Sequence, residues 1–131
     1  MSTATALADP APTQDAAAAI VRLIRQHRFD LSTEKCVQAQ LEEALAREGI
    51  VFEREKRLSA QDIPDFVLAG GVVLECKMRG ARKMDIYKQL RRYAVYPDVT
   101  ALILVSNLAM GLPPEINGKP VYAASLSRGW I

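Results

Sequence analysis

The amino-acid sequence predicts an α/β domain of three layers, in which helices flank a mixed central β-sheet. Two stretches with the apolar spacing of helices open the chain, and runs rich in β-branched residues follow. Two of these runs are separated by Ala69-Gly70-Gly71, which is typical of a hairpin turn. A helical stretch over residues 83–96 then lies between two further runs. A crossover of this length allows the strands that it joins to be parallel.

The helices are expected over residues 15–29 and 32–49, before the crossover helix. Asp15 is the expected N-cap of the first helix, and Ser32 or Thr33 that of the second. Gly49 suits the end of the second helix, and Pro97 ends the crossover helix. Strands are expected over the following residues: 50–58, 64–68, 72–77, 100–105 and 119–123. The run 100–105 is apolar throughout, as in strands buried on both faces.

Length and composition favour one domain. The chain has 131 residues, of which 50% are apolar and 24% charged, with a net charge of +2. Residues 1–14 are small, polar and proline-containing, so we expect a flexible tail there and a single domain over residues 15–131. The weakly basic charge permits a nucleic-acid partner but does not identify one.

The cysteines and the apolar runs exclude several classes of protein. Cys36 and Cys76 do not form a CxxC pair, so a zinc site or disulfide framework is not expected, and Cys76 is expected to be a buried thiol. Apolar runs are shorter than the roughly 18 residues that span a bilayer, and the N-terminus lacks the features of a signal peptide. We therefore expect no membrane partner and a cytoplasmic location.

The most informative stretch runs from Ile63 to Lys77. Asp65 begins one strand of the expected hairpin, and Glu75 and Lys77 lie near the end of the other. Side chains two residues apart on a strand share a face, so Glu75 and Lys77 should point the same way while Cys76 points into the opposite layer. The hairpin should bring Asp65 back beside Glu75. Two carboxylates and an ammonium group would then meet at one edge of the sheet.

This set of residues suits a hard divalent cation. Mg²⁺, or Mn²⁺ in its place, takes oxygen ligands, which Asp65 and Glu75 would supply together with the backbone carbonyl of Cys76. Such a cation stabilises charge on a scissile phosphate and activates water. Lys77 would orient that water or help to deprotonate it. The sequence therefore predicts metal-dependent phosphodiester hydrolysis.

These residues resemble the PD-(D/E)XK nuclease superfamily. Pro64-Asp65 matches the PD element and Glu75-Cys76-Lys77 the (D/E)XK element, with nine residues between the two acids. The resemblance covers residues 32–106 and implies a restriction-endonuclease-like core in the order α-β-β-β-α-β. Gln89 and Tyr93, four residues apart, resemble the QxxxY motif of RecB-like nucleases, which places them beside the metal and the substrate phosphate. The family also implies a metal-binding acid on the preceding helix, for which Glu34 is the first choice, before Glu42 and Glu43.

A basic segment follows the motif. It predicts contacts with the phosphate backbone of DNA, and its residues are Arg79, Arg82, Lys83, Lys88, Arg91 and Arg92. Arg54, Lys56 and Arg57 precede the motif. Few exposed aromatic residues accompany the segment, so base stacking is not indicated. The resemblance thus implies a deoxyribonuclease of recombination, repair or phage DNA processing. A Holliday-junction resolvase is one compatible case, which would imply a homodimer or larger homo-oligomer.

Each of these features also has a purely structural alternative. Asp65 would cap a turn, Glu75 would pair with Lys77 or Arg79 at an edge strand, and Gln89 and Tyr93 would be ordinary helix residues. The basic segment would be a solvated helix face. The alternative function is a catalytically inactive DNA-binding module with a nuclease-like fold. His27 is expected on the surface of the first helix, and Trp130 is expected to pack the C-terminus down.

Overall fold

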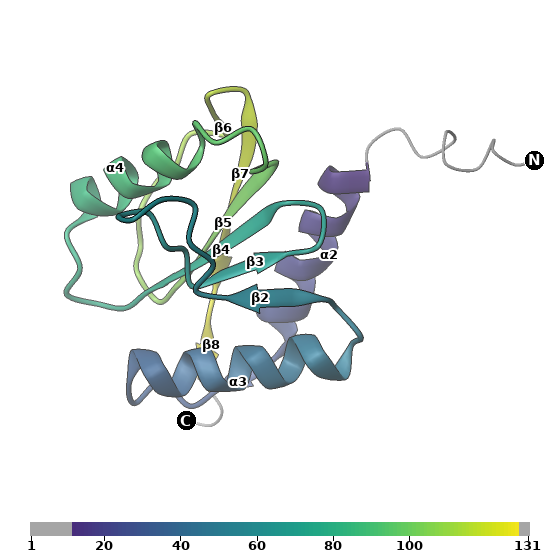
Figure 1. The fold of residues 1–131 in the computed structure, drawn as a ribbon. Helices are drawn as coiled ribbons and strands as arrows, with labels where there is room; N and C mark the ends of the chain where they lie inside the picture. Colours follow the sequence, from purple (N-terminus) through teal and green to yellow (C-terminus); the bar gives the residue numbers. More distant parts are fainter. Residues whose placement is uncertain (1–11, 129–131) are drawn as a thin grey trace, which may run out of the picture.

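The computed structural model describes residues 12–128, which form an α/β fold around a six-stranded mixed sheet (Figure 1). Three helices are found in the described part of the chain: α2 (Pro12–Gln26), α3 (Glu34–Arg47) and α4 (Lys83–Tyr93). The strands of the large sheet are β2 (Phe52–Arg54), β3 (Phe66–Leu68), β4 (Val72–Lys77), β5 (Ala101–Ser106), β6 (Glu115–Ile116) and β7 (Lys119–Ser125). Two short strands, β1 (Arg28–Phe29) and β8 (Ser127–Arg128), pair separately.

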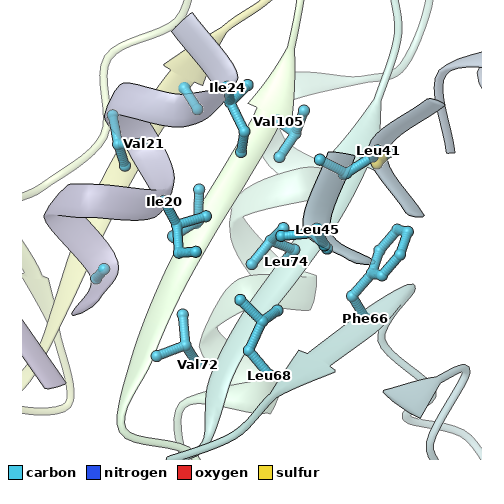
Figure 2. Close-up of a cluster of buried hydrophobic side chains, with 14 of the residues drawn as sticks. Ile20, Val21, Ile24, Leu41, Leu45, Phe66, Leu68, Val72, Leu74 and Val105 are labelled. Atoms are coloured by element: carbon cyan, nitrogen blue, oxygen red, sulfur yellow. The ribbon is translucent and has the colours of Figure 1, made fainter. Parts of the chain in front are cut away.

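The sheet lies between two helical layers. Alternate side chains of β4 divide between two apolar clusters, because successive residues of a strand point to opposite faces. Leu74 and Cys76 pack with residues of α2 and α3, whereas Val73 packs with residues of α4. Figure 2 shows the first cluster, in which Leu45 of α3 lies near Leu74 of β4. The site predicted at the end of β4 therefore faces α4.

The strand order is β2-β3-β4-β5-β7-β6. β3 and β4 form an antiparallel hairpin, and β4 and β5 are parallel with α4 as their crossover, as the sequence predicts. Gly70 and Gly71 both have positive φ angles in the hairpin turn. A side chain at Gly71 would also collide with the carbonyl of Asp98, so this position requires glycine on two grounds. Residues 34–106 thus follow the order helix, three strands, helix, strand.

The ends of the helices differ from the prediction in two places. α2 begins at Pro12, so Asp15 lies inside the helix and the predicted N-cap is wrong. Proline suits the first position of a helix because its missing N–H would be unpaired there anyway. Thr33 caps α3 by accepting a hydrogen bond from the N–H of Cys36 at 3.0 Å, as predicted. α4 ends at Tyr93, three residues earlier than expected.

The first helix also ends before residue 29, because β1 pairs in parallel with β8 and buries Phe29. His27 follows α2 and its ring lies 4.5 Å from that of Phe29, centroid to centroid. Of the predicted tail, residues 1–11 lie outside the described part of the chain, as does Trp130, and residues 12–14 belong to α2. The sequence did not predict β1, β6 or β8.

Two strands are shorter than predicted. β2 covers only residues 52–54, because Glu55 has a positive φ of 50° and turns the chain. β3 starts at Phe66 rather than Pro64, since proline has no N–H to donate to a sheet. β5 is buried over its whole length, as expected for a central strand. No helix in the described residues is long and apolar enough to cross a membrane.

Candidate active site

Asp65 and Glu75 lie side by side at one edge of the sheet, and we call them the acidic pair. Phe66 of β3 is opposite Leu74 of β4, so the next positions outward are Asp65 and Glu75. Asp65 Oδ2 accepts a 2.7 Å hydrogen bond from the N–H of Cys76, and the N–H of Asp65 donates to Glu75 Oε1 at 3.2 Å. The carboxylate of Asp65 thereby continues the pairing of the two strands after the β3 ladder has ended.

Lys77 completes the cluster that the sequence predicts. Its Nζ lies 3.4 Å from Glu75 Oε2, with 25% of the Lys77 side chain exposed and only 4% of the Glu75 side chain. The two side chains share a face because they are two residues apart on β4. The ammonium group is therefore held between a buried carboxylate and solvent. A group at this boundary can reach both the acidic pair and a ligand approaching from outside.

Tyr93, the last residue of α4, also contacts the acidic pair. Its ring is fully buried, and its hydroxyl donates a hydrogen bond to Glu75 Oε1 at 3.2 Å. Burial, reinforced by the charge of Glu75, raises the pKa of Tyr93 above its ordinary value, so the hydroxyl stays protonated and remains a donor. Gln89, one helical turn earlier, lines an open cleft together with Lys77. Both residues of the QxxxY pattern thus face the end of β4.

Burial makes the charged forms of both members of the acidic pair less favourable. Burial, followed by the negative charge of Asp65, raises the pKa of Glu75 from 4.5 to about 7. Burial also raises the pKa of Asp65, although the hydrogen bond from Cys76 opposes this effect. The negative charge of Asp65 thus disfavours a second negative charge on the buried Glu75. A bound cation would relieve that repulsion.

Cys76 lies between the pair and the opposite layer. Its side chain is fully buried, which confirms the expected buried thiol, and burial raises the pKa of that thiol. Residues of an antiparallel ladder direct their N–H and C=O groups to the same neighbour. Because the N–H of Cys76 meets Asp65, its carbonyl faces that same edge beyond the start of β3. The backbone oxygen is therefore on the side where the acidic pair lies.

The residues present suit an oxygen-liganded cation, but only as an incomplete set. Asp65, Glu75 and the carbonyl of Cys76 offer the hard oxygen donors that Mg²⁺ prefers, and Mg²⁺ commonly keeps several waters. In the described residues, no group of three or more His, Cys, Asp and Glu side chains is arranged to hold a metal ion. The charge of Glu34 contributes to the raised pKa of Asp65, and Glu34 Oε2 accepts a hydrogen bond from Gln38 Nε2 at 3.4 Å.

An arginine that the sequence did not place in the site connects α3 with the acidic pair. Arg54 Nε donates to the carbonyl of Asp65 at 3.2 Å, and the guanidinium lies 4.4 Å from the centre of the Phe66 ring. Its other nitrogens bind Glu42 Oε1 and Gln38 Oε1, each at 2.8 Å. Glu42 is therefore occupied by an ion pair, and Glu43 is an exposed residue paired with Arg47.

A basic cleft adjoins the cluster. Its volume is about 430 Å³, and its lining residues are Lys77, Ala81, Arg82, Asp85, Ile86, Lys88, Gln89 and Arg92. Of the predicted DNA-binding residues, it therefore contains Arg82, Lys88 and Arg92. Arg79, Lys83 and Arg91 are exposed outside this lining; Arg91 stacks over Tyr87 at 5.6 Å. Cations beside the acidic pair favour an anionic ligand in the cleft.

Arg92 has a structural partner that the sequence did not reveal. Its Nε donates to Asp62 Oδ1 at 2.9 Å, and the hydroxyl of Tyr96 donates to Asp62 Oδ2 at 2.7 Å. Asp62 is buried, so Arg92, which the sequence predicts as a phosphate contact, also forms an ion pair within the fold. Asp62 lies in a polar loop, where nothing in the sequence distinguishes a buried acid from a solvated one.

The arrangement brings together two carboxylates, an ammonium group, a neutral phenol and a basic cleft. These groups can hold a cation, orient a nucleophilic water and neutralise a phosphate. Gln89 and Lys77 both line the cleft, and Lys77 also contacts Glu75 of the acidic pair. Comparisons of the chain with models of protein families, with curated proteins and with solved structures gave no match.

Proposed function

We propose that the chain is a Mg²⁺-dependent deoxyribonuclease of the PD-(D/E)XK type with a restriction-endonuclease-like core. The contact of Asp65 with Glu75, with Lys77 beside them, carries this proposal. The order of α3, β2, β3, β4, α4 and β5 agrees with the order that the resemblance implies. The hydrogen bond between Tyr93 and Glu75 supports the comparison with QxxxY nucleases.

The acidic pair and the Cys76 carbonyl would hold the cation, which when bound supplies charge stabilisation at the scissile phosphate. Lys77 would orient the attacking water, because its ammonium group lies between the buried Glu75 and solvent. Tyr93 would keep Glu75 in position by donating to Oε1. Gln89 would contact the phosphate group at the mouth of the cleft.

The substrate class follows from the cleft. Arg82 and Lys88 would bind the phosphate backbone of DNA, which provides affinity with little dependence on base sequence. Hydrolysis of this kind would serve recombination, repair or phage DNA processing.

Incubation of the purified chain with linear, nicked, single-stranded and branched DNA tests the proposal directly. We expect cleavage of at least one form with Mg²⁺ or Mn²⁺ and none with EDTA. Glu75→Gln is the matched variant, because it keeps the size of a nearly buried side chain and removes its charge. Cleavage by Glu75→Gln at the wild-type rate would contradict the proposal. Tight DNA binding by a wild type that cleaves no form would favour the inactive DNA-binding module.

A further inference from the structure

Asp62 is a buried carboxylate outside the acidic pair, in the loop that joins β2 to β3. Its side chain is 10% exposed. One oxygen accepts the hydrogen bond from Arg92 Nε and the other accepts from the hydroxyl of Tyr96. A buried charge is costly unless it is paired and hydrogen-bonded, and both oxygens of Asp62 meet that condition. These contacts tie the loop to the C-terminal end of α4.

The loop is also closed around the backbone of Asp62. Its carbonyl accepts the N–H of Leu58 at 2.9 Å, and its own N–H donates to Ser59 Oγ at 3.1 Å. Residues 58–62 therefore form a compact turn that ends at Asp62. Loss of the Asp62 carboxylate would free the side of this turn that packs on α4.

The link from Asp62 to Asp65 is short and stiff. Only Ile63 and Pro64 separate them, so their Cα atoms are at most roughly 11 Å apart. Proline has a nearly fixed φ and holds the preceding residue in an extended conformation. Pro64 is also buried. A movement of Asp62 would therefore be passed on to Asp65 rather than absorbed between them.

The last turn of α4 and the turn that follows it hold both segments that carry the acidic pair. Tyr93 binds Glu75 on β4, while Arg92 and Tyr96 bind the loop that leads to Asp65. The neighbouring part of the same helix contributes Lys88 and Gln89 to the basic cleft. α4 and the turn after it thus connect the cleft with both acidic segments.

We infer that Asp62 is a positioning residue, which through Arg92 and Tyr96 fixes Asp65 against β4. The catalytic consequence of this inference rests on the proposed function, whereas its structural consequence rests on the hydrogen bonds alone. Outer partners that orient metal-binding groups commonly change activity 10- to 100-fold when they are lost. The same role makes Arg92 a support of the site more than a contact of the substrate.

Amide hydrogen exchange of the full chain tests the structural part without any activity. The Cys76 amide is the reporter, because it donates to Asp65 Oδ2. Asp62→Asn and the milder Tyr96→Phe should each increase its exchange rate, by about tenfold for Asp62→Asn, while the amides of β5 keep their rates. Glu53→Gln is the control, since it removes an exposed ion pair, that of Glu53 with Lys56, and should leave Cys76 unchanged.

An unchanged Cys76 rate in the folded Asp62→Asn variant would overturn the positioning role. An equal increase in the exchange rates of the β5 amides would also overturn it, because Asp62 would then stabilise the whole fold rather than position Asp65.

Cleavage kinetics with Mg²⁺ test the catalytic part. Arg92→Gln should lower kcat about 10- to 100-fold with little change in the KM for DNA, because it misplaces Asp65 without removing a main substrate contact. A raised KM with unchanged kcat would overturn the inference and make Arg92 a DNA contact. If the wild type cleaves no DNA, the proposed function fails, and the exchange rates alone uphold or overturn the positioning role.

Discussion

The hydroxyl of Tyr93 donates a hydrogen bond to Glu75 Oε1 across the contact between α4 and β4, at 3.2 Å. This bond joins a helix that lines the basic cleft to the strand that carries the acidic residue. It also leaves Glu75 Oε2 facing Lys77. The two oxygens of Glu75 thus have different roles. Oε1 is held by Tyr93, and Oε2 lies beside Lys77, which we propose orients the attacking water.

Lys77→Ala separates catalysis from binding. We expect cleavage to fall by roughly 10²- to 10⁴-fold, the scale of one acid–base or positioning group. DNA affinity should change far less, because Arg82 and Lys88 remain in the cleft. Single-turnover cleavage and filter binding measure the two quantities. Asp65→Ala should also lose cleavage, and excess Mg²⁺ should partly restore that variant but not Lys77→Ala. Equal rescue of both variants would contradict the role of Lys77.

Tyr93→Phe removes one donor from a buried carboxylate. We expect a loss of about 1–3 kcal/mol in the free energy of unfolding at a pH where Glu75 is charged, because its Oε1 loses a partner. Tyr87→Phe is the control, since the Tyr87 ring is half-buried and stacks under Arg91. Urea unfolding measures both variants. Equal stability of Tyr93→Phe and Tyr87→Phe would show that the hydrogen bond contributes nothing.

The stability of the metal-free protein should depend on pH through Glu75. The pKa of Glu75 is about 7 in the fold against an ordinary value of 4.5, so the folded state favours the protonated form. Glu75 therefore makes its largest contribution to the free energy of unfolding below pH 4.5. It should fall by roughly 3 kcal/mol as the pH rises through 7, at 1.36 kcal/mol for each pKa unit.

Asp62 affects the free energy of unfolding in the opposite direction to Glu75 and in a more acidic pH range. Hydrogen bonds, first that from Tyr96, hold its pKa below the ordinary 3.8, so its contribution is lost only under more acidic conditions. Urea unfolding at a series of pH values separates the contributions of Asp62 and Glu75. Glu75→Gln should flatten the dependence of the free energy of unfolding on pH above pH 4.5 but not in the more acidic range. A wild-type stability that rises between pH 4.5 and 7 would contradict the raised pKa of Glu75.

Mg²⁺ should stabilise the fold more at alkaline than at acidic pH. A cation competes with protons for the acidic pair, so its effect should be small where Glu75 is protonated and should grow above pH 7. Thermal unfolding with and without Mg²⁺ gives the shift in Tm at each pH. The shift should be absent in Glu75→Gln. A shift of equal size at every pH would point to binding elsewhere.

Replacing Arg82 and Lys88 together with alanine should weaken binding to every DNA sequence alike. The slope of log Kd against log salt should fall by about 1 for each lost phosphate contact. Arg47→Ala on α3 is the control, because α3 and α4 cover opposite faces of the sheet. Binding titrations at several salt concentrations measure the slope. Slopes equal to that of the wild type would mark the cleft as a solvated helix face.

Local patterns allowed much of the fold to be predicted. Glycines with positive φ define the hairpin between β3 and β4, and the apolar run of β5 has the composition of a central strand. The convergence of Asp65, Glu75 and Lys77 follows from that hairpin and from the period of two in a strand. Short strands were missed, since β1 and β8 hold two residues each and exist only by pairing with one another.

The sequence by itself determined the hairpin, the crossover helix and the residue types at the end of β4, because turn chemistry and side-chain periodicity act over a few residues. Only the tertiary structure decided which charges are paired. Asp62 and Arg92 are 30 residues apart, and Arg54 lies 12 residues from Glu42, so no local rule relates them. Their contacts, and the raised pKa of Glu75, depend on which surfaces the packed layers remove from water.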